Sequence, residues 1–195
     1  KEGAIERYKL ALEACPQDRT AAAALRAAYA SRGDVAATFA LIEREVATTD
    51  SPLQKARLYA EMAAVAYDKL QDAAKARAAA AKAIELEASN VIALRVLGEL
   101  AYESQDWAET AQRLELPAQR ADTFDRDVAV RLLLRFVDAL ARTGASERAV
   151  KETARLRGFL PDDAESLDRI GRLFFQFGDP KSSYELHLEL LEQHG

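Results

Sequence analysis

Few residues in this sequence could carry chemistry, and their spacing does not suit it. The two histidines, His187 and His194, have no cysteine or paired carboxylate at the spacing of a zinc site. The single cysteine, Cys15, lies at the end of a predicted helix, where the helix dipole disfavours a reactive thiolate. Phosphate-binding glycine loops and nucleophile elbows are missing from the sequence. We therefore predict no catalytic residue, no metal and no cofactor, and expect that the chain is not an enzyme.

The elements that position these residues are expected to be helices. The chain has 195 residues, 49% hydrophobic and 30% charged, which is sufficient for a folded core. Alanine is abundant, whereas glycine (8) and proline (5) are few, and this composition favours helix. The formal charge is -5 without any run rich in lysine or arginine, so we expect no nucleic-acid partner. No apolar stretch reaches about 18 residues, so we expect no membrane insertion.

Three stretches of the chain share one spacing of residue types. They begin at Asp18, Asn90 and Asp163, and each has a large apolar residue at the same offset, at Leu25, Leu97 and Ile170. Each stretch also ends on an aspartate, and these are Asp34, Asp106 and Asp179. Two further copies begin at Arg57 and Val130. Repetition at this period indicates a helical repeat protein.

The repeated unit resembles the tetratricopeptide repeat, a helix–turn–helix of about 34 residues. That family places small residues at repeat positions 8 and 20, an aromatic or apolar residue at 11, glycine at 15 and proline at 32. Ala64, Tyr67 and Ala76 occupy positions 8, 11 and 20 of one copy, and Gly144 and Pro161 occupy positions 15 and 32 of another. The resemblance gives the second half of a repeat over 1–18 and full repeats over 19–52, 57–90, 91–124, 130–163 and 164–195.

Some positions depart from the family pattern. Arg26 and Val137 occupy position 8, where a small residue is usual, so we expect looser packing in those two repeats. Pro117 falls well inside a second helix, where it removes a backbone donor, and it predicts a kink or an early stop near Leu116. The additional residues 53–56 and 125–129 are expected to lengthen the first helices of their repeats.

Helix ends and turns are marked by particular residues. Ser51-Pro52 and Asp179-Pro180 predict helix starts, because the first residue caps the helix and proline suits its first position. Glycine occupies the turn position in three repeats, where a left-handed backbone is expected, and these residues are Gly33, Gly144 and Gly178.

The resemblance implies an all-α fold, a right-handed α-solenoid superhelix of antiparallel helix pairs. It implies about eleven helices in a single domain over residues 1–195. Natural solenoids end in polar capping repeats, whereas this sequence begins and ends within the array. We therefore expect a segment of a longer bacterial-type protein that self-associates through its uncapped end repeats.

The resemblance also implies a binding groove lined by the first helix of each repeat. The predicted groove residues combine acids and arginines with aromatic and aliphatic side chains that could anchor a ligand, and they are Glu61, Val65, Arg95, Glu99, Tyr102, Leu134, Asp138, Asp168, Arg172 and Phe175. The family's clamp for a terminal carboxylate is missing from the corresponding positions. A second interpretation is a solvated groove whose charges form ordinary ion pairs between adjacent helices.

Two functions follow from these features. The first is an interaction scaffold or adaptor that binds a partner peptide or helix in the groove. The alternative is a structural or regulatory spacer, or an oligomerisation arm, within a larger multidomain or envelope-assembly protein. The single cysteine mildly favours the reducing cytoplasm, with the periplasm as the alternative compartment.

Overall fold

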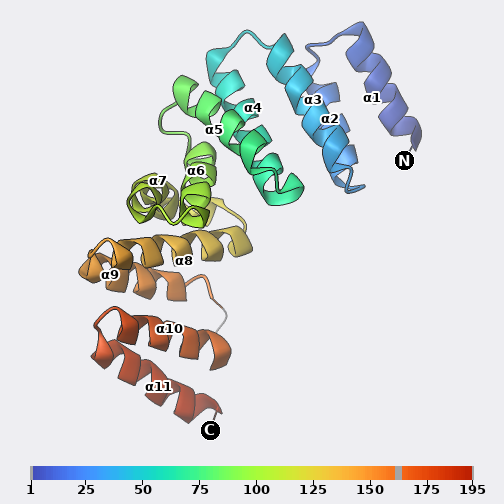
Figure 1. Ribbon diagram of the computed structural model, residues 1–195. Coiled ribbons are helices and arrows are strands. Elements are labelled where there is room, and N and C mark those ends of the chain that lie inside the picture. The colour runs from blue at the N-terminus through green and yellow to red at the C-terminus, as the bar shows by residue number, and fades with distance from the viewer. Residues whose placement is uncertain (1, 161–163, 195) are drawn as a thin grey trace. The chain divides into compact units, whose positions relative to one another are not determined.

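The computed structural model describes residues 2–160 and 164–194, and throughout these residues the regular structure is helical (Figure 1). The prediction of an all-α fold of about eleven helices arranged in pairs is confirmed. The eleven α-helices of the described chain, with one π-helical and one 3-10 turn, are α1 (Glu2–Ala14), α2 (Arg19–Ala30), α3 (Val35–Thr48), α4 (Pro52–Val65), η1 (Ala66–Leu70), α5 (Ala73–Leu86), α6 (Val91–Glu103), α7 (Trp107–Gln119), η2 (Ala121–Thr123), α8 (Arg126–Arg142), α9 (Ser146–Arg157), α10 (Ala164–Gln176) and α11 (Pro180–His194).

Short polar side chains begin most of these helices, as the sequence predicts. The Asp34 carboxylate accepts a hydrogen bond from the Ala37 amide at 3.1 Å, and Asp106 accepts one from Glu109 at 3.0 Å. Ser51 caps α4 with proline at the first position, which confirms that expectation. Asp179 accepts a hydrogen bond from the Ser182 amide at 3.1 Å, directly before Pro180 begins α11. Asp163, which begins the third of the matching stretches in the sequence, lies outside the described residues.

The turn within each repeat adopts the left-handed conformation at the predicted position. The backbone φ is +70° at Gly33, +83° at Gly144 and +89° at Gly178, which confirms the three glycine turns. The other two repeats place glutamine there, with φ of 53° at Gln71 and 60° at Gln105. The left-handed turn therefore forms in all five repeats, including the two where a side chain disfavours it.

The chain divides into two compact units, residues 1–97 and residues 98–195, with the division inside α6. In the first unit, consecutive helices from α1 to α4 pack on one another, and α5 packs on α4. The core between α1, α2 and α3 contains Leu12, Leu25 and Leu41. The single domain over 1–195 and the repeat boundaries stay predictions.

In the second unit, consecutive helices from α7 to α11 pack on one another. One continuous core joins them, and its largest fully buried side chain is Phe136 of α8. None of the helices in the described part of the chain is long and apolar enough to cross a membrane.

Two departures from the repeat pattern have different structural outcomes. The early stop near Leu116 is wrong, because α7 continues through Pro117 to Gln119. Pro117 lies in the last turn of α7, and the hydrogen bond that it cannot donate is the one to the carbonyl four residues earlier. Near the end of a helix the loss of this one bond does not stop the last two residues from remaining helical. At the small-residue position of its repeat, Arg26 reaches outward and pairs with Glu45 of α3 and Glu61 of α4, and the looser packing expected there stays a prediction.

Candidate functional site

Glu99, predicted to lie in the groove, is buried inside the second unit. Its side chain has no exposed surface, and its carboxylate lies 2.5 Å from Arg135 and 3.1 Å from Arg131, both on α8. This helix is the long first helix of the repeat that follows the repeat of Glu99. Because the carboxylate is enclosed by these guanidinium groups, Glu99 holds α6 to α8 and presents no charge to a ligand.

Arg95 is also buried, within the first unit. Its guanidinium donates to both carboxylate oxygens of Asp68, at 2.6 and 3.2 Å, and lies over the ring of Tyr67. Only 3% of the Arg95 side chain is exposed. Arg95 and Glu99 therefore form ion pairs between helices, but these pairs are buried, unlike the solvated pairs of the second interpretation.

The predicted residues of α4 lie at the surface of the first unit. Glu61 is half-exposed and pairs with Arg26, and Val65 is half-buried at the end of the helix. Arg26 also lies 3.2 Å from Glu45. Burial raises the pKa of the Glu45 carboxyl above its ordinary value, the Arg26 charge opposes this rise, and the nearby Glu61 charge adds to it.

Tyr102 is held in place by a network of polar and aromatic contacts. Its hydroxyl donates to Asp138 at 2.9 Å, and its ring meets the ring of Trp107 edge-on. Arg135 lies over the Tyr102 ring, and Arg142 lies over Trp107 while pairing with Asp138 at 2.9 Å. Burial raises the pKa of the Tyr102 phenol, and its hydrogen bond to Asp138 raises it further.

The predicted residues of α10 are more exposed. Arg172 pairs with Asp168 one turn earlier, at 2.8 Å, and His187 of α11 lies 3.5 Å from the same carboxylate. Phe175 is 70% exposed. The structure does not bring Arg172 or Phe175 together with Tyr102.

A groove runs along α8 in the second unit, with a volume of about 870 Å³. We call it the α8 groove, and the residues that line it are Tyr102, Arg126, Asp127, Val130, Arg131, Leu134, Arg135, Asp138, Arg142, Phe159, Leu160, Arg169 and Leu173. One stripe of α8 lines it at four-residue intervals, from Arg126 through Leu134 to Arg142. At a rise of 1.5 Å per residue, this stripe extends for about 24 Å, enough for several turns of a bound helix.

The α8 groove combines apolar and cationic side chains. Val130, Leu134 and Leu173 supply aliphatic surface. Phe159 and Leu160, which follow α9 in the chain, also line the groove. Its charged residues are five arginines and two aspartates. This combination suits an amphipathic protein segment, because aromatic and arginine side chains provide much of the binding energy at protein interfaces.

Three predicted site residues line the α8 groove, namely Tyr102, Leu134 and Asp138. On α10 the lining residues are Arg169 and Leu173, each one position after the predicted Asp168 and Arg172. One residue turns a helix by about 100°, so this small shift in position exchanges an outward side chain for a lining one. The periodicity of α8, beginning at Arg126 in the inserted residues 125–129, is the sequence signal that could have identified the longer groove.

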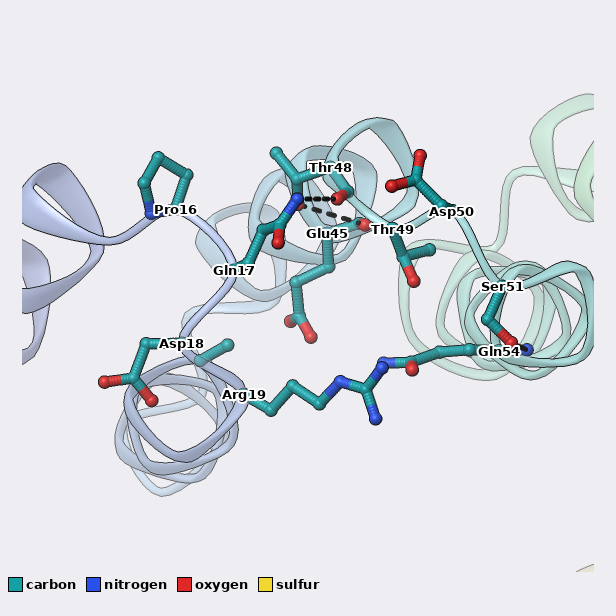
Figure 2. A pocket seen from close by; sticks show the side chains of 11 residues that line it. Pro16, Gln17, Asp18, Arg19, Glu45, Thr48, Thr49, Asp50, Ser51 and Gln54 are labelled. Atoms are coloured by element: carbon teal, nitrogen blue, oxygen red, sulfur yellow. Dashed lines mark hydrogen bonds between the residues drawn. The ribbon is translucent and has the colours of Figure 1, made fainter.

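A smaller and more polar hollow, of about 210 Å³, lies in the first unit (Figure 2). It is bounded by the turn after α1, the end of α3 and the start of α4. Two hydrogen bonds join residues of its lining: Gln17 donates to the Thr48 carbonyl at 3.1 Å, and Ser51 accepts from the Gln54 amide. None of the predicted site residues lies there, and its contacts explain it as a junction between helix ends.

Metal-ligating residues do not gather in the described part of the chain. Within it, no group of three or more histidines, cysteines, aspartates or glutamates could hold a metal ion. Cys15 is exposed, and the side chain of His194 lies outside the described residues.

Comparison with known proteins places the fold. No family model matches the sequence, and no curated protein matches it. The solved structures similar to this chain include YrrB, a TPR protein with an unusual peptide-binding site, with a TM-score of 0.67 and 16% identity over 97% of this chain and 95% of that chain. MamA from Desulfovibrio magneticus RS-1 is similar with a TM-score of 0.63 and 13% identity, over 89% of this chain and 96% of that chain.

A third similar structure contains TPR-like repeats of a putative kinesin light chain from Podosopora anserina. Its TM-score is 0.61 and its identity 16%, over 92% of this chain and 99% of that chain. At such low identities these similarities establish the fold alone. The chain has the tetratricopeptide-repeat fold, which confirms the resemblance found in the sequence.

Proposed function

We propose that this protein is an interaction scaffold that binds a segment of a partner protein in the α8 groove. The observation that carries the proposal is a groove of about 870 Å³ in which aliphatic side chains and arginines lie side by side. Such a lining can desolvate apolar side chains of a ligand and pair with its polar groups. The proposal assigns the chain a binding role and no catalytic one.

The internal contacts of the groove support this proposal. Buried ion pairs from Glu99 to Arg131 and Arg135 connect α6 with α8. The Tyr102–Asp138 hydrogen bond connects α6 and α8 again, farther along α8. A wall fixed by such contacts loses little conformational entropy when a ligand binds, which favours affinity.

The similarity to YrrB is consistent with this function. YrrB is a TPR protein with an unusual peptide-binding site, and it shares the fold of this chain. Tyr102, Leu134 and Asp138 are the predicted site residues that we propose to contact the partner, with Arg95 and Glu99 supporting the helices that carry them.

The alternative function, an oligomerisation or spacer arm, is favoured by a different surface. On α11, Tyr184 is 65% exposed, Leu188 40% and Leu191 64%. These residues are spaced by four and three positions, so they form one apolar stripe along the helix. A stripe of this kind is suited to packing against another helix, whether of the same or of another chain.

Photocrosslinking distinguishes the two functions. We would place the photoreactive residue p-benzoylphenylalanine at Val130 in the groove, at Tyr184 on the α11 stripe, or at Lys151 on the exposed side of α9 as a control. The scaffold function predicts crosslinks from Val130 to a protein other than this chain, few from Lys151, and from Tyr184 only crosslinks to a second copy of this chain. Crosslinks from Tyr184 alone would contradict it and support the oligomerisation arm.

A further inference from the structure

The charges of the α8 groove are unevenly compensated. Arg131 and Arg135 share the buried carboxylate of Glu99, and Arg142 pairs with Asp138. Within the described part of the chain, Arg126 and Arg169 form no ion pair. Arg126 uses its Nε to donate to the Phe159 carbonyl at 2.7 Å, which leaves the rest of its guanidinium for other acceptors.

Each of these two arginines lies one helical turn before an aliphatic side chain of the groove. Arg126 precedes Val130 by four residues on α8, and Arg169 precedes Leu173 by four residues on α10. Residues four apart lie on the same face of a helix, about one turn from each other. The groove thus repeats a pairing of a cation and an apolar surface on two separate helices.

From this pairing we infer that the α8 groove selects acidic segments of a partner protein in which carboxylates alternate with bulky apolar side chains. This inference rests on the proposed function and names the chemistry of its ligand. A carboxylate opposite each arginine would form a charge-assisted hydrogen bond, with an apolar neighbour resting on Val130 or Leu173. The whole chain carries a net charge of -5, so this local excess of arginine is not a general property of its surface.

A protein segment fits the groove better than a nucleic acid does. Single-stranded nucleic acids require continuous positive charge and aromatic stacking platforms. In the α8 groove the arginines are interrupted by two aspartates and by aliphatic residues, and Tyr102, one of its two aromatic residues, already packs edge-on against Trp107. The aliphatic surface is explained by an apolar side chain of a peptide.

The test uses fluorescein-labelled peptides with the full chain. One peptide contains four copies of Glu-Glu-Leu, its neutral counterpart contains four copies of Gln-Gln-Leu, and oligothymidylate of similar length serves as a polyanion. Affinities are measured by fluorescence polarisation. We expect the acidic peptide to bind about tenfold more tightly than the neutral one, as two partly exposed ion pairs would provide. Its affinity should fall as salt is added.

The decisive variant is Arg126→Gln with Arg169→Gln. This variant should bind the acidic peptide about tenfold more weakly than the wild type does, and its affinity for the neutral peptide should change by less than about twofold. The matched control, Arg120→Gln with Lys151→Gln, removes two exposed positive charges of the second unit from outside the groove and should change neither affinity. Arg126→Lys with Arg169→Lys keeps the charge and should recover most of the acidic preference, which separates a charge effect from a folding defect.

Several outcomes would overturn the inference. Equal binding of the two peptides would do so, as would a double glutamine variant that behaves like the control. Oligothymidylate binding as tightly as the acidic peptide would identify the groove as a general polyanion site. If no peptide binds while the photocrosslink from Val130 still forms, the acidic selectivity is wrong and the scaffold function stands.

Discussion

Individual residues of the predicted groove have two kinds of role, and burial separates them. Glu99 is fully buried between two arginines, whereas Asp138 and Leu134 line an accessible groove on the adjacent helix. A buried charge is tolerated only when its partners compensate the loss of hydration. The ion pairs of Glu99 are therefore part of the packing between helices, and removing one partner has a cost in stability.

Glu99→Gln should lower the free energy of unfolding by about 1–3 kcal/mol, because two arginines lose their common counter-ion. This loss of stability is smaller than the loss expected for a fully enclosed ion-pair cluster, because Arg131 is 38% exposed and can be hydrated. Urea unfolding followed by circular dichroism measures the change. The control is Glu103→Gln on the same helix, whose exposed pair with Arg135 is worth less than about 1 kcal/mol. Equal losses for the two variants would contradict the structural role of Glu99.

The pH dependence of stability should report on Glu45. Because burial raises its folded-state pKa above the ordinary value of 4.5, the folded protein holds the proton more tightly than the unfolded chain does. Its stabilising contribution is present below pH 4.5 and is lost as the pH rises through the raised pKa. Relative to Glu45→Gln, the wild-type protein should lose stability across this interval. Urea unfolding over a pH series would contradict this if the difference between the two proteins stayed constant or grew in favour of the wild type.

At the scale of the elements, the turn between two helices follows one design with varied residues. In four of the five repeats, the residue after the left-handed position donates a backbone hydrogen bond five residues back, as Asp106 does to Ala101 at 3.0 Å. In the remaining repeat Asp72 donates to Ala66 at 3.0 Å, one residue farther back, and the Gln71 amide donates to the same carbonyl at the end of the π-helical turn η1. The hydrogen bonds enforce the left-handed turn even where glutamine occupies it.

Gln105→Gly should therefore stabilise the protein. The glutamine has φ of 60° and is exposed, so glycine would relieve a left-handed backbone without losing buried contacts. The gain should be about 0.5–1 kcal/mol, after allowing for the greater entropy of glycine in the unfolded chain. Gly144→Gln is the matched reverse substitution and should destabilise by a similar amount. Thermal unfolding measures both, and a lower melting temperature for Gln105→Gly would contradict the expectation.

The start of α9 differs from the starts of the second helices in the other repeats and offers a second test. Ala145 precedes α9 and provides no side-chain hydrogen bond, whereas Asp34, Asp72 and Asp106 cap the equivalent helices. Ala145→Asp should add the missing acceptor and raise the free energy of unfolding by up to about 1 kcal/mol. Asp106→Ala, the converse change, should lower it by about the same amount. If Ala145→Asp destabilises the protein, the apolar contacts of Ala145 with the core outweigh the cap.

At the scale of the whole molecule, each of the two units has its own core, and some apolar surface is left uncovered. The stripe on α11 exposes Tyr184, Leu188 and Leu191, and Leu10 on α1 is 57% exposed. Large apolar side chains aligned on one helix face are typical of contact surfaces. These surfaces support the proposed self-association through the end repeats.

Tyr184→Gln with Leu191→Gln should weaken self-association by about tenfold or more, because two large apolar side chains no longer gain from burial. Sedimentation equilibrium over a range of protein concentrations measures the change. Leu53→Gln with Leu86→Gln removes two exposed apolar residues elsewhere and should have little effect. A wild-type protein that remains monomeric at high concentration would contradict the proposal.

Most of the helices, several of their caps and three of the turns between them could be predicted from the sequence alone. These features depend on local chemistry: an aspartate or serine satisfies free amides, proline suits the first turn, and the Gly33, Gly144 and Gly178 positions accept a left-handed backbone. The repeat spacing then identified the fold, because repetition of such local signals is visible without any knowledge of contacts.

Which polar residues are buried in ion pairs and which line an accessible groove depends on the tertiary structure. Arg95 and Glu99 fit the groove pattern as well as Asp138 does, yet two of the three are buried in ion pairs. The partner of a buried charge can come from the following repeat, about 30 residues away, as Arg131 of α8 does for Glu99 of α6. A rotation of about 100° on α10 likewise places Leu173 rather than Arg172 in the groove. Burial and facing depend on how helices pack, and the residue pattern of one helix does not contain that information.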